Sequence, residues 1–247
     1  MELDGVILLA ANTARSRAYA QTLQARDHSL AGTILFDRAG ADNPGKSGAP
    51  PKPGVETSVN LPDLSIPIET TCHAICAHLD SVEAETVNDP AVIRSVKAAA
   101  DSGAKLVIYS GYGGQLVGPE LLSMGLPFLH LHSGWLPEYR GSTTIYYSLL
   151  DGESCGVSAI LLDPEIDQGP IVGRRKYPPP PASVDIDFFY DSAIRADLMA
   201  DTVEAWARAD GFADLVVQPE SSDGAFFVIH PLLKHVALLS LRDEKTL

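Results

Sequence analysis

The stretch from Gly103 to His132, GAKLVIYSGYGGQLVGPELLSMGLPFLHLH, contains the unit that decides the fold. After Gly103, the run KLVIYSG is apolar and β-branched, which predicts a buried strand. Pro119 predicts the start of a helix, because proline is favoured in the first helical turn. The run Phe128–His132 predicts a second strand. A strand, a helix and another strand in this order indicate two parallel strands joined by a crossover helix.

The same alternation continues on both sides of this unit. We therefore predict an α/β fold, a Rossmann-like, parallel-rich sheet with helices on both faces. A Gly/Pro-rich surface loop interrupts it at 38–62, and a short C-terminal helix and a β-hairpin at 215–241 follow it. We expect a catalytic core at 1–180 and an extension at 181–247 packed on that core. Further strands are predicted at 5–10, 31–36 and 156–162, and further helices at 13–27, from Asp89 onward, at 143–150 and at 190–208.

Charge and composition exclude several classes of partner. The 247 residues carry a formal net charge of −14, whereas nucleic-acid binders usually present a basic face. Three cysteines do not make a disulfide framework. The N-terminus MELDGVILLAA has acidic residues where a signal peptide needs basic ones, and no apolar run reaches the ~20 residues of a membrane span. We expect a cytoplasmic protein with no nucleic-acid or membrane partner.

Two histidines, His130 and His132, share one face of the last strand quoted above, because side chains two apart in a strand point the same way. Asp163 and Asp167 follow the next predicted strand. The carboxyl ends of parallel strands are where α/β proteins bind ligands. Two roles are open for two histidines and an aspartate there: a metal site, or acid–base catalysis with an oxyanion donor. The glycines at 111, 113 and 114 lack dinucleotide-binding spacing.

The motifs around this strand resemble those of the formyltransferases that use 10-formyltetrahydrofolate. They are His132-Ser133, Leu136-Pro137, Tyr139-Arg140-Gly141 and Asp167-x-Gly169-x-Ile171. The resemblance implies a formyltransferase core, with His132 as the catalytic histidine and Asp167 as the catalytic aspartate. His130 stands where the family has an asparagine that holds the formyl oxygen. A histidine serves that purpose through an N–H group, either neutral or as imidazolium.

The resemblance also implies 10-formyltetrahydrofolate as co-substrate, with no metal. The loop from Ser110 to Leu116 matches one wall of the pterin site, and 162–167 matches the other. The residues expected to contact the donor are Tyr112, Gly113, Gly114, Gln115, Leu116, Leu162, Asp163 and Ile166.

The expected acceptor is a small primary amine, an amino sugar or nucleotide-linked amino sugar of the kind used in bacterial surface-glycan synthesis. The acidic segment after the core does not resemble the tRNA-gripping domain of methionyl-tRNA formyltransferases. The turn after the first strand also lacks the phosphate-binding glycines of glycinamide ribonucleotide enzymes.

Alternatives are a metal-dependent enzyme using His130, His132 and Asp167, a formyltetrahydrofolate hydrolase, and a glycinamide ribonucleotide or amino-acid formyltransferase. A homodimer is the assembly considered. The residues expected to line the acceptor site are Arg15, Tyr146, Tyr147 and Arg195.

Overall fold

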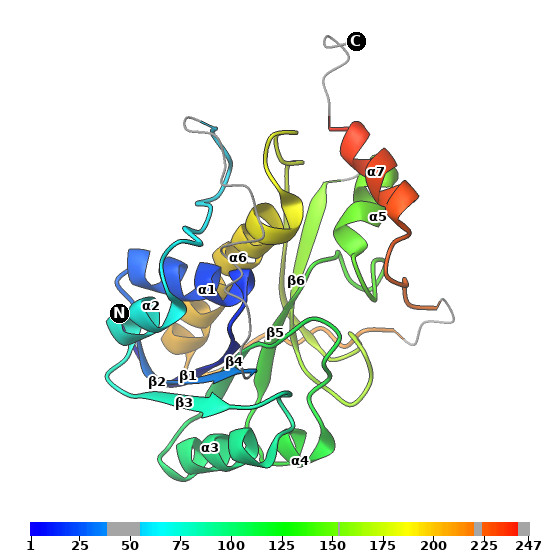
Figure 1. Ribbon diagram of the computed structural model, residues 1–247. Coiled ribbons are helices and arrows are strands. Elements are labelled where there is room, and N and C mark those ends of the chain that lie inside the picture. Colours follow the sequence, from blue (N-terminus) through cyan, green and yellow to red (C-terminus); the bar gives the residue numbers. More distant parts are fainter. Residues whose placement is uncertain (39–54, 153, 220–223, 242–247) are drawn as a thin grey trace.

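The computed structural model describes residues 1–38, 55–152, 154–219 and 224–241. Its centre is a seven-stranded sheet of order β3-β2-β1-β4-β5-β6-β7 (Figure 1). The strands from β1 to β5 run parallel, while β6 and β7 are antiparallel to their neighbours. This confirms the predicted parallel-rich sheet. The strands are β1 (Glu2–Ala11), β2 (Ser29–Asp37), β3 (Leu79–Glu83), β4 (Leu106–Ser110), β5 (Phe128–His132), β6 (Cys155–Leu161) and β7 (Ile171–Tyr177).

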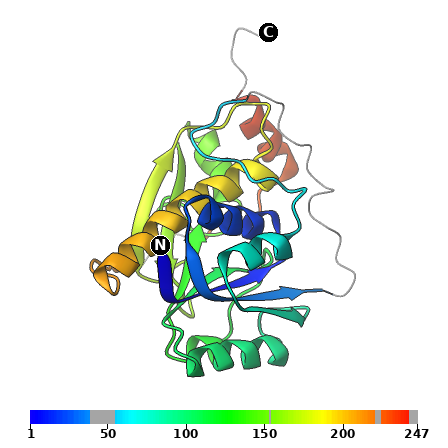
Figure 2. The same ribbon diagram turned by 90° about the vertical axis from the view of Figure 1, so that its left-hand side faces the viewer.

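Helices cover both faces of the sheet, as predicted (Figures 1 and 2). One face packs against α1, α2 and α6, and the other against α3 and α4. Helix α5 lies beside β6 and also contacts α7. The helices are α1 (Ala14–Ala25), α2 (Ile68–Ile75), α3 (Pro90–Asp101), α4 (Pro119–Leu122), α5 (Thr144–Leu150), the π-helix η2 (Ile186–Tyr190), α6 (Asp191–Ala209) and α7 (Pro231–Leu239).

Local sequence signals explain where the main helices begin. The Thr13 hydroxyl accepts a hydrogen bond from the backbone N–H of Ser16 and caps α1. The Asp89 carboxylate accepts from the N–H of Ala91 and caps α3, with Pro90 in the first turn, as the sequence indicated. Both helices follow parallel strands, β1 and β3, and therefore begin at the carboxyl edge of the sheet.

The tail does not form the predicted hairpin, and that prediction is wrong. Between 215 and 229 the described residues form only isolated bridges, Val216 with Ile171 and Phe226 with Gly141. The later part of the second apolar run forms helix α7. Its start is fixed by Pro231 in the first turn and by the His230 ring, which accepts from the N–H of Leu232.

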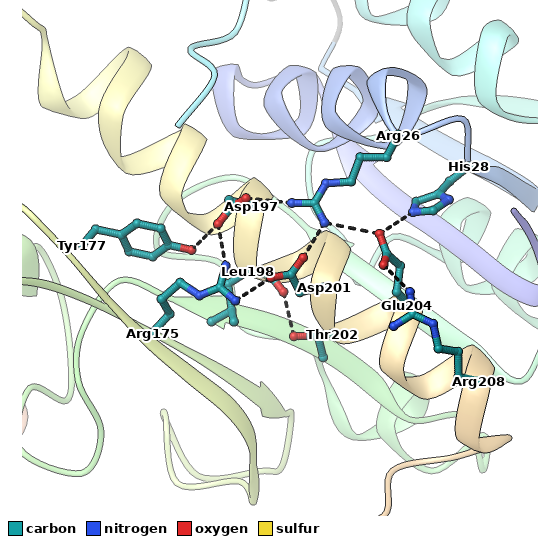
Figure 3. Close-up of polar contacts among 10 residues, drawn as sticks. All are labelled: Arg26, His28, Arg175, Tyr177, Asp197, Leu198, Asp201, Thr202, Glu204 and Arg208. Atoms are coloured by element: carbon teal, nitrogen blue, oxygen red, sulfur yellow. Dashed lines mark hydrogen bonds and ion pairs between the residues drawn. The ribbon is translucent and has the colours of Figure 1, made fainter. Parts of the chain in front are cut away.

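Helix α6 belongs to the main core. Its Ile194, Leu198, Val203 and Trp206 are buried in the same cluster as α1 and the central strands, as predicted for 190–208. A group of ion pairs at its surface ties α6 to the end of α1 and to β7 (Figure 3). Arg26 contacts three carboxylates of α6, and Arg175 contacts two of them. The carboxylates are Asp197, Asp201 and Glu204.

Two further sequence expectations concern the segment that follows β2 and membrane-spanning helices. Most of the loop predicted at 38–62 falls on residues 39–54, outside the described residues, while 55–62 has no helix or strand. Within the described ranges, no helix has the length and apolarity needed to cross a membrane.

Candidate functional site

The two histidines lie at the carboxyl end of β5, on one face of the sheet, as predicted. Leu129 and Leu131 alternate with them and point into the core beneath α1 and α6. His130 is the register partner of Tyr109 on β4, and the two ring centroids lie 6.1 Å apart. The strand therefore directs both imidazoles to the edge where the β4 and β5 loops begin.

His132 is held between a carboxylate and a backbone carbonyl. Its Nδ1 lies 3.4 Å from Asp167 Oδ1, and its Nε2 lies 2.6 Å from the carbonyl oxygen of Tyr139. A carbonyl oxygen only accepts hydrogen bonds, so Nε2 carries the hydrogen. In the neutral ring, Nδ1 is then the atom with a free lone pair. A proton taken up at Nδ1 forms an imidazolium that the adjacent Asp167 carboxylate stabilises.

Asp167 reaches His132 from an unusual backbone conformation. Its φ is 54°, in the left-handed region. Its Oδ2 accepts from the N–H of Gly141 at 3.0 Å, and the Gln218 amide donates to its backbone carbonyl at 2.9 Å. Gly169 must lack a side chain because a Cβ would overlap the carbonyl of Leu161. This close approach gives the Asp-x-Gly spacing a structural reason.

The turn after β5 packs tightly under the His132 ring. A Cβ at Gly134 would lie 2.6 Å from His132 Nε2 and nearer still to the carbonyl of Tyr139. The Leu136-Pro137 peptide is cis, and the N–H of Leu136 donates to the Ser158 hydroxyl at 3.0 Å. Glycine is thus required where the turn passes the His132 ring.

Burial and neighbouring charges give the two histidines different electrostatics. Burial lowers the pKa of His132, but the Asp167 carboxylate opposes that shift. The pKa of His130 is held well below its usual value, first by burial and then by the charges of Arg15 and Arg195. His130 is therefore neutral at pH 7. Its Nδ1 is buried and has no hydrogen-bond partner within the described part of the chain.

The loop from Ser110 to Leu116 is the first segment predicted to contact the folate. Hydrogen bonds hold it to β2 and to the segment after β3. The Tyr112 hydroxyl donates to Asp37 at 2.6 Å, and the Gln115 amide donates to a backbone carbonyl at 2.8 Å. Gly113 and Gly114 face open space. Leu116 is 58% exposed. The loop therefore offers bare backbone and one exposed aliphatic side chain.

The second predicted wall follows β6. The N–H of Leu162 donates to the carbonyl of Phe128 at 2.8 Å, which continues the β5–β6 contact. The Asp163 carboxylate accepts from the N–H of Glu165 and forms a local turn. Ile166 is 50% exposed. Each segment thus presents one exposed aliphatic side chain, and the first also has open space at its glycines, so both can contact the face of a flat ring.

Of the four residues predicted to bind the acceptor, Arg15 and Arg195 lie near the two histidines. Arg15 donates to the Ser110 hydroxyl at 3.2 Å, and Arg195 donates to the carbonyl of Leu131 at 3.1 Å. Arg195 also pairs with Asp191 one turn earlier on α6, at 2.9 Å. This i,i+4 pair is partly buried at the strand ends.

The two tyrosines predicted for the same role are engaged elsewhere. The Tyr146 hydroxyl donates to Asp187 at 2.6 Å, and Lys234 lies over its ring. The Tyr147 hydroxyl donates to the carbonyl of Phe227 at 3.2 Å. Both hydroxyls therefore hold η2 and the C-terminal segment against α5.

Other residues of the site were not found by sequence reasoning. The carbonyl of Tyr139 orients the His132 ring, and Gln218 holds the backbone of Asp167. A backbone acceptor leaves no side-chain signal in a sequence. Gln218 lies 51 positions from Asp167, in a segment that the sequence predicted only as part of a hairpin.

One group of potential metal ligands is present among the described residues. His130, His132 and Asp167 each offer one ligand atom, and these atoms lie within 4.8 Å of one another. Two imidazoles and a carboxylate suit zinc or iron. The cysteines and histidines between 72 and 78 do not form such a group within the described ranges.

The chain is similar in sequence to methionyl-tRNA formyltransferases. The protein of that name from Chloroflexus aurantiacus is 28% identical over 167 residues, which are 65% of this chain and 50% of the relative. The one from Rhodopirellula baltica is 38% identical over 95 residues, 38% of this chain and 27% of the relative. The chain thus spans about half the length, or less, of the curated relatives it matches.

Solved structures share the fold. A sugar N-formyltransferase from a Shewanella species superimposes with a TM-score of 0.55 at 17% identity, covering 96% of this chain and 87% of that one. Glycinamide ribonucleotide transformylase 1 from Symbiobacterium toebii gives 0.57 at 14% identity, covering 87% and 93%. A family model described as formyl transferase matches residues 50–182, more than half of the sequence. With the predicted motifs assembled at the strand ends, the chain belongs to the formyl transferase family.

Proposed function

We propose that this protein transfers the formyl group of 10-formyltetrahydrofolate to a primary amine of a small acceptor, an amino sugar or nucleotide-linked amino sugar. The observation that carries the proposal is the pair of the buried His132 and the partly buried Asp167, 3.4 Å apart, in a chain of the formyl transferase family. The donor supplies an electrophilic formyl carbon. The residues described above supply a base, a stabilising carboxylate and an oxyanion donor.

His132 is the base. Its Nε2–H is committed to the Tyr139 carbonyl, which leaves Nδ1 to take the proton of the acceptor amine as its nitrogen bonds to the formyl carbon. The negative charge of Asp167 compensates the positive charge that develops on the ring. The bond from the formyl carbon to the folate nitrogen then breaks, and the proton returns to the departing nitrogen.

His130 is the oxyanion donor. Since its pKa lies well below the usual value, it acts through a neutral N–H group. A neutral donor fixed on β5 stabilises charge on the formyl oxygen without competing for the proton that His132 takes. The amide of the family's asparagine offers the same kind of donor.

The donor binds between the loop carrying Leu116 and the segment carrying Ile166. Both side chains are exposed, and open space surrounds Gly113 and Gly114, so a flat ring meets aliphatic groups and bare backbone there. Such a site favours apolar contact with a few backbone hydrogen bonds.

Two observations support a small acceptor. The likeness to a sugar N-formyltransferase structure extends over 96% of this chain, and the net charge of −14 is unfavourable for a tRNA. The sequence relatives are methionyl-tRNA formyltransferases, so a tRNA acceptor belongs in the test.

The test is a transfer assay with purified protein and 10-formyltetrahydrofolate. Amino sugars, nucleotide-linked amino sugars, glycinamide ribonucleotide, amino acids and methionyl-tRNA are offered in parallel, and formylated product is detected by mass spectrometry. A product from a sugar amine that is lost in His132→Ala supports the proposal. Formate release with no formylated product indicates a hydrolase. Product only from methionyl-tRNA refutes the small acceptor.

A metal-dependent enzyme is the second candidate, because three potential ligand atoms lie within 4.8 Å. Metal analysis of the purified protein decides between the two. One zinc or iron per chain, lost in His130→Asn and needed for turnover, supports the second candidate. Full transfer activity after chelation refutes it.

A further inference from the structure

Arg15 is a cation without an acidic partner at the catalytic edge. It lies in the first turn of α1, half-buried, and donates from Nε to the Ser110 hydroxyl at 3.2 Å and from a terminal nitrogen to the carbonyl of Gly111. A guanidinium has five N–H donors and no acceptor. Three donors are left after these two bonds, and within the described ranges no carboxylate forms an ion pair with Arg15.

Arg195 binds the strand next to the one that Arg15 binds. Tyr109 on β4 and His130 on β5 are register partners, so the following residues, Ser110 and Leu131, lie on neighbouring strand ends. Arg15 is bound to the first and Arg195 to the second. Neighbouring strands are about 4.8 Å apart, which brings the two guanidinium groups to one place. The Asp191 carboxylate pairs with Arg195 and lies close enough to act on Arg15 as well, so the two guanidinium groups share one carboxylate.

A buried hydroxyl without a partner lies at the same edge. Tyr19 follows Arg15 by one turn of α1, is 0% exposed, and its hydroxyl has no hydrogen-bond partner in the described part of the chain. Burial raises the pKa of Tyr19 to about 12, against the charges of Arg15 and Arg195, so the hydroxyl keeps its proton. Buried polar groups normally have partners, and an unpaired one calls for an explanation.

These groups share one chemical requirement. The free N–H groups of Arg15 and the Tyr19 hydroxyl are donors, and the surplus charge is positive, so the missing partner is a negatively charged oxygen acceptor. The neighbouring His130 belongs to the proposed catalytic centre.

We infer that Arg15, together with Arg195 and the Tyr19 hydroxyl, forms a subsite for an oxyanion, a carboxylate or phosphate group carried by the acceptor. The inference rests on the proposed function in that it takes this edge as the acceptor side of the formyl-transfer centre. It narrows the acceptor to an amine with an anionic group beside the reacting nitrogen. Neutral amino sugars are then poor acceptors, and amino sugars that bear a phosphate or carboxylate group are good ones.

Anion binding to the protein alone tests the subsite without a known acceptor. The thermal unfolding midpoint is followed in rising concentrations of inorganic phosphate and, separately, of acetate, at constant ionic strength set with sodium chloride. Wild type is compared with Arg15→Gln and with Arg94→Gln, which removes the same charge from an exposed position on α3. Arg15→Met, which keeps an unbranched side chain but has neither charge nor donor, serves where Arg15→Gln does not fold. The two salts distinguish a phosphate from a carboxylate.

A saturable rise in the midpoint for wild type and Arg94→Gln, weakened at least about tenfold in apparent affinity in the Arg15 variants, is expected from the loss of a charge-assisted bond. No saturable response to either anion, or an equal response in the Arg15 variants, overturns the subsite. Binding of a stable folate analogue is measured on the same samples. Folate binding without an anion response refutes only the subsite, and an anion response without folate binding refutes formyl transfer but keeps the subsite.

Discussion

Replacing Gly134 by alanine tests the proposed geometry of the base directly. The added Cβ would lie 2.6 Å from His132 Nε2 and closer to the carbonyl of Tyr139, whereas real Cβ contacts below 3.0 Å essentially do not occur. The ring must therefore move away from the added Cβ by at least about 0.4 Å and the carbonyl oxygen by at least about 0.7 Å, which disturbs the hydrogen bond between them. A displacement of ~1 Å at a reacting group costs about 10²-fold in rate. We expect Gly134→Ala to lower kcat between about 10- and 100-fold.

Two assays follow this change, and the first needs no acceptor. Imidazole nitrogen NMR reports which ring nitrogen of His132 carries the hydrogen, and the Nε2–H form should lose its dominance in Gly134→Ala. The transfer assay then measures kcat. Gly224→Ala is the matched control, because its added methyl group meets nothing within 4 Å. Wild-type tautomer and kcat in Gly134→Ala would refute the assignment of Nδ1 as the base.

Three further predictions concern titration and stability. Asp167→Asn should shift the acidic limb of the kcat/KM profile to lower pH, because the carboxylate raises the pKa of His132; an unchanged limb contradicts this. His130 has a lowered folded pKa, so the unfolded chain binds more protons and wild type loses stability as pH falls below about 6.5. In urea titrations His130→Asn should lose less stability over that window, and parallel curves would exclude the effect. Arg26→Gln, at a side chain 29% exposed, should lower the free energy of unfolding by about 1–2 kcal/mol. Arg208→Gln, at a side chain 64% exposed, should lower it by less than about 0.5 kcal/mol, because water screens an exposed ion pair. Equal losses in the two variants would contradict a stabilising role of the Arg26 ion pairs.

The central sheet was predictable because its signals are local. The parallel βαβ units are marked by apolar strand segments and by two helix starts, one at Pro119 and one at the Asp89-Pro90 cap. None of these signals requires tertiary information. The antiparallel pairing of β7 with β6 could also have been predicted from the sequence. The connection from Leu161 to Ile171 is shorter than the dozen or so residues of a crossover.

The predicted C-terminal hairpin is wrong because the local strand propensity of these residues is not matched by a sheet edge with which they could pair. Residues 215–217 (LVV) and 226–229 (FFVI) favour strands, but a strand needs a sheet edge, and each segment finds only one bridge. The helix signal of His230-Pro231 was present in the sequence. In the site, the shared face of the histidines follows from the two-residue period of a strand, whereas the carbonyl of Tyr139 depends on how the turn folds back.

In the proposed mechanism, the environment separates two like residues on one strand into two roles. His132 has a carboxylate at Nδ1, which opposes the effect of burial and keeps proton uptake within reach. His130 faces arginines and a second imidazole, which add to burial and keep it neutral. A base must change its charge during the reaction, while an oxyanion donor must not. The same positive edge that fixes His130 as a neutral donor also provides the charge for an anionic acceptor. His130 can therefore replace an asparagine amide without becoming a second base.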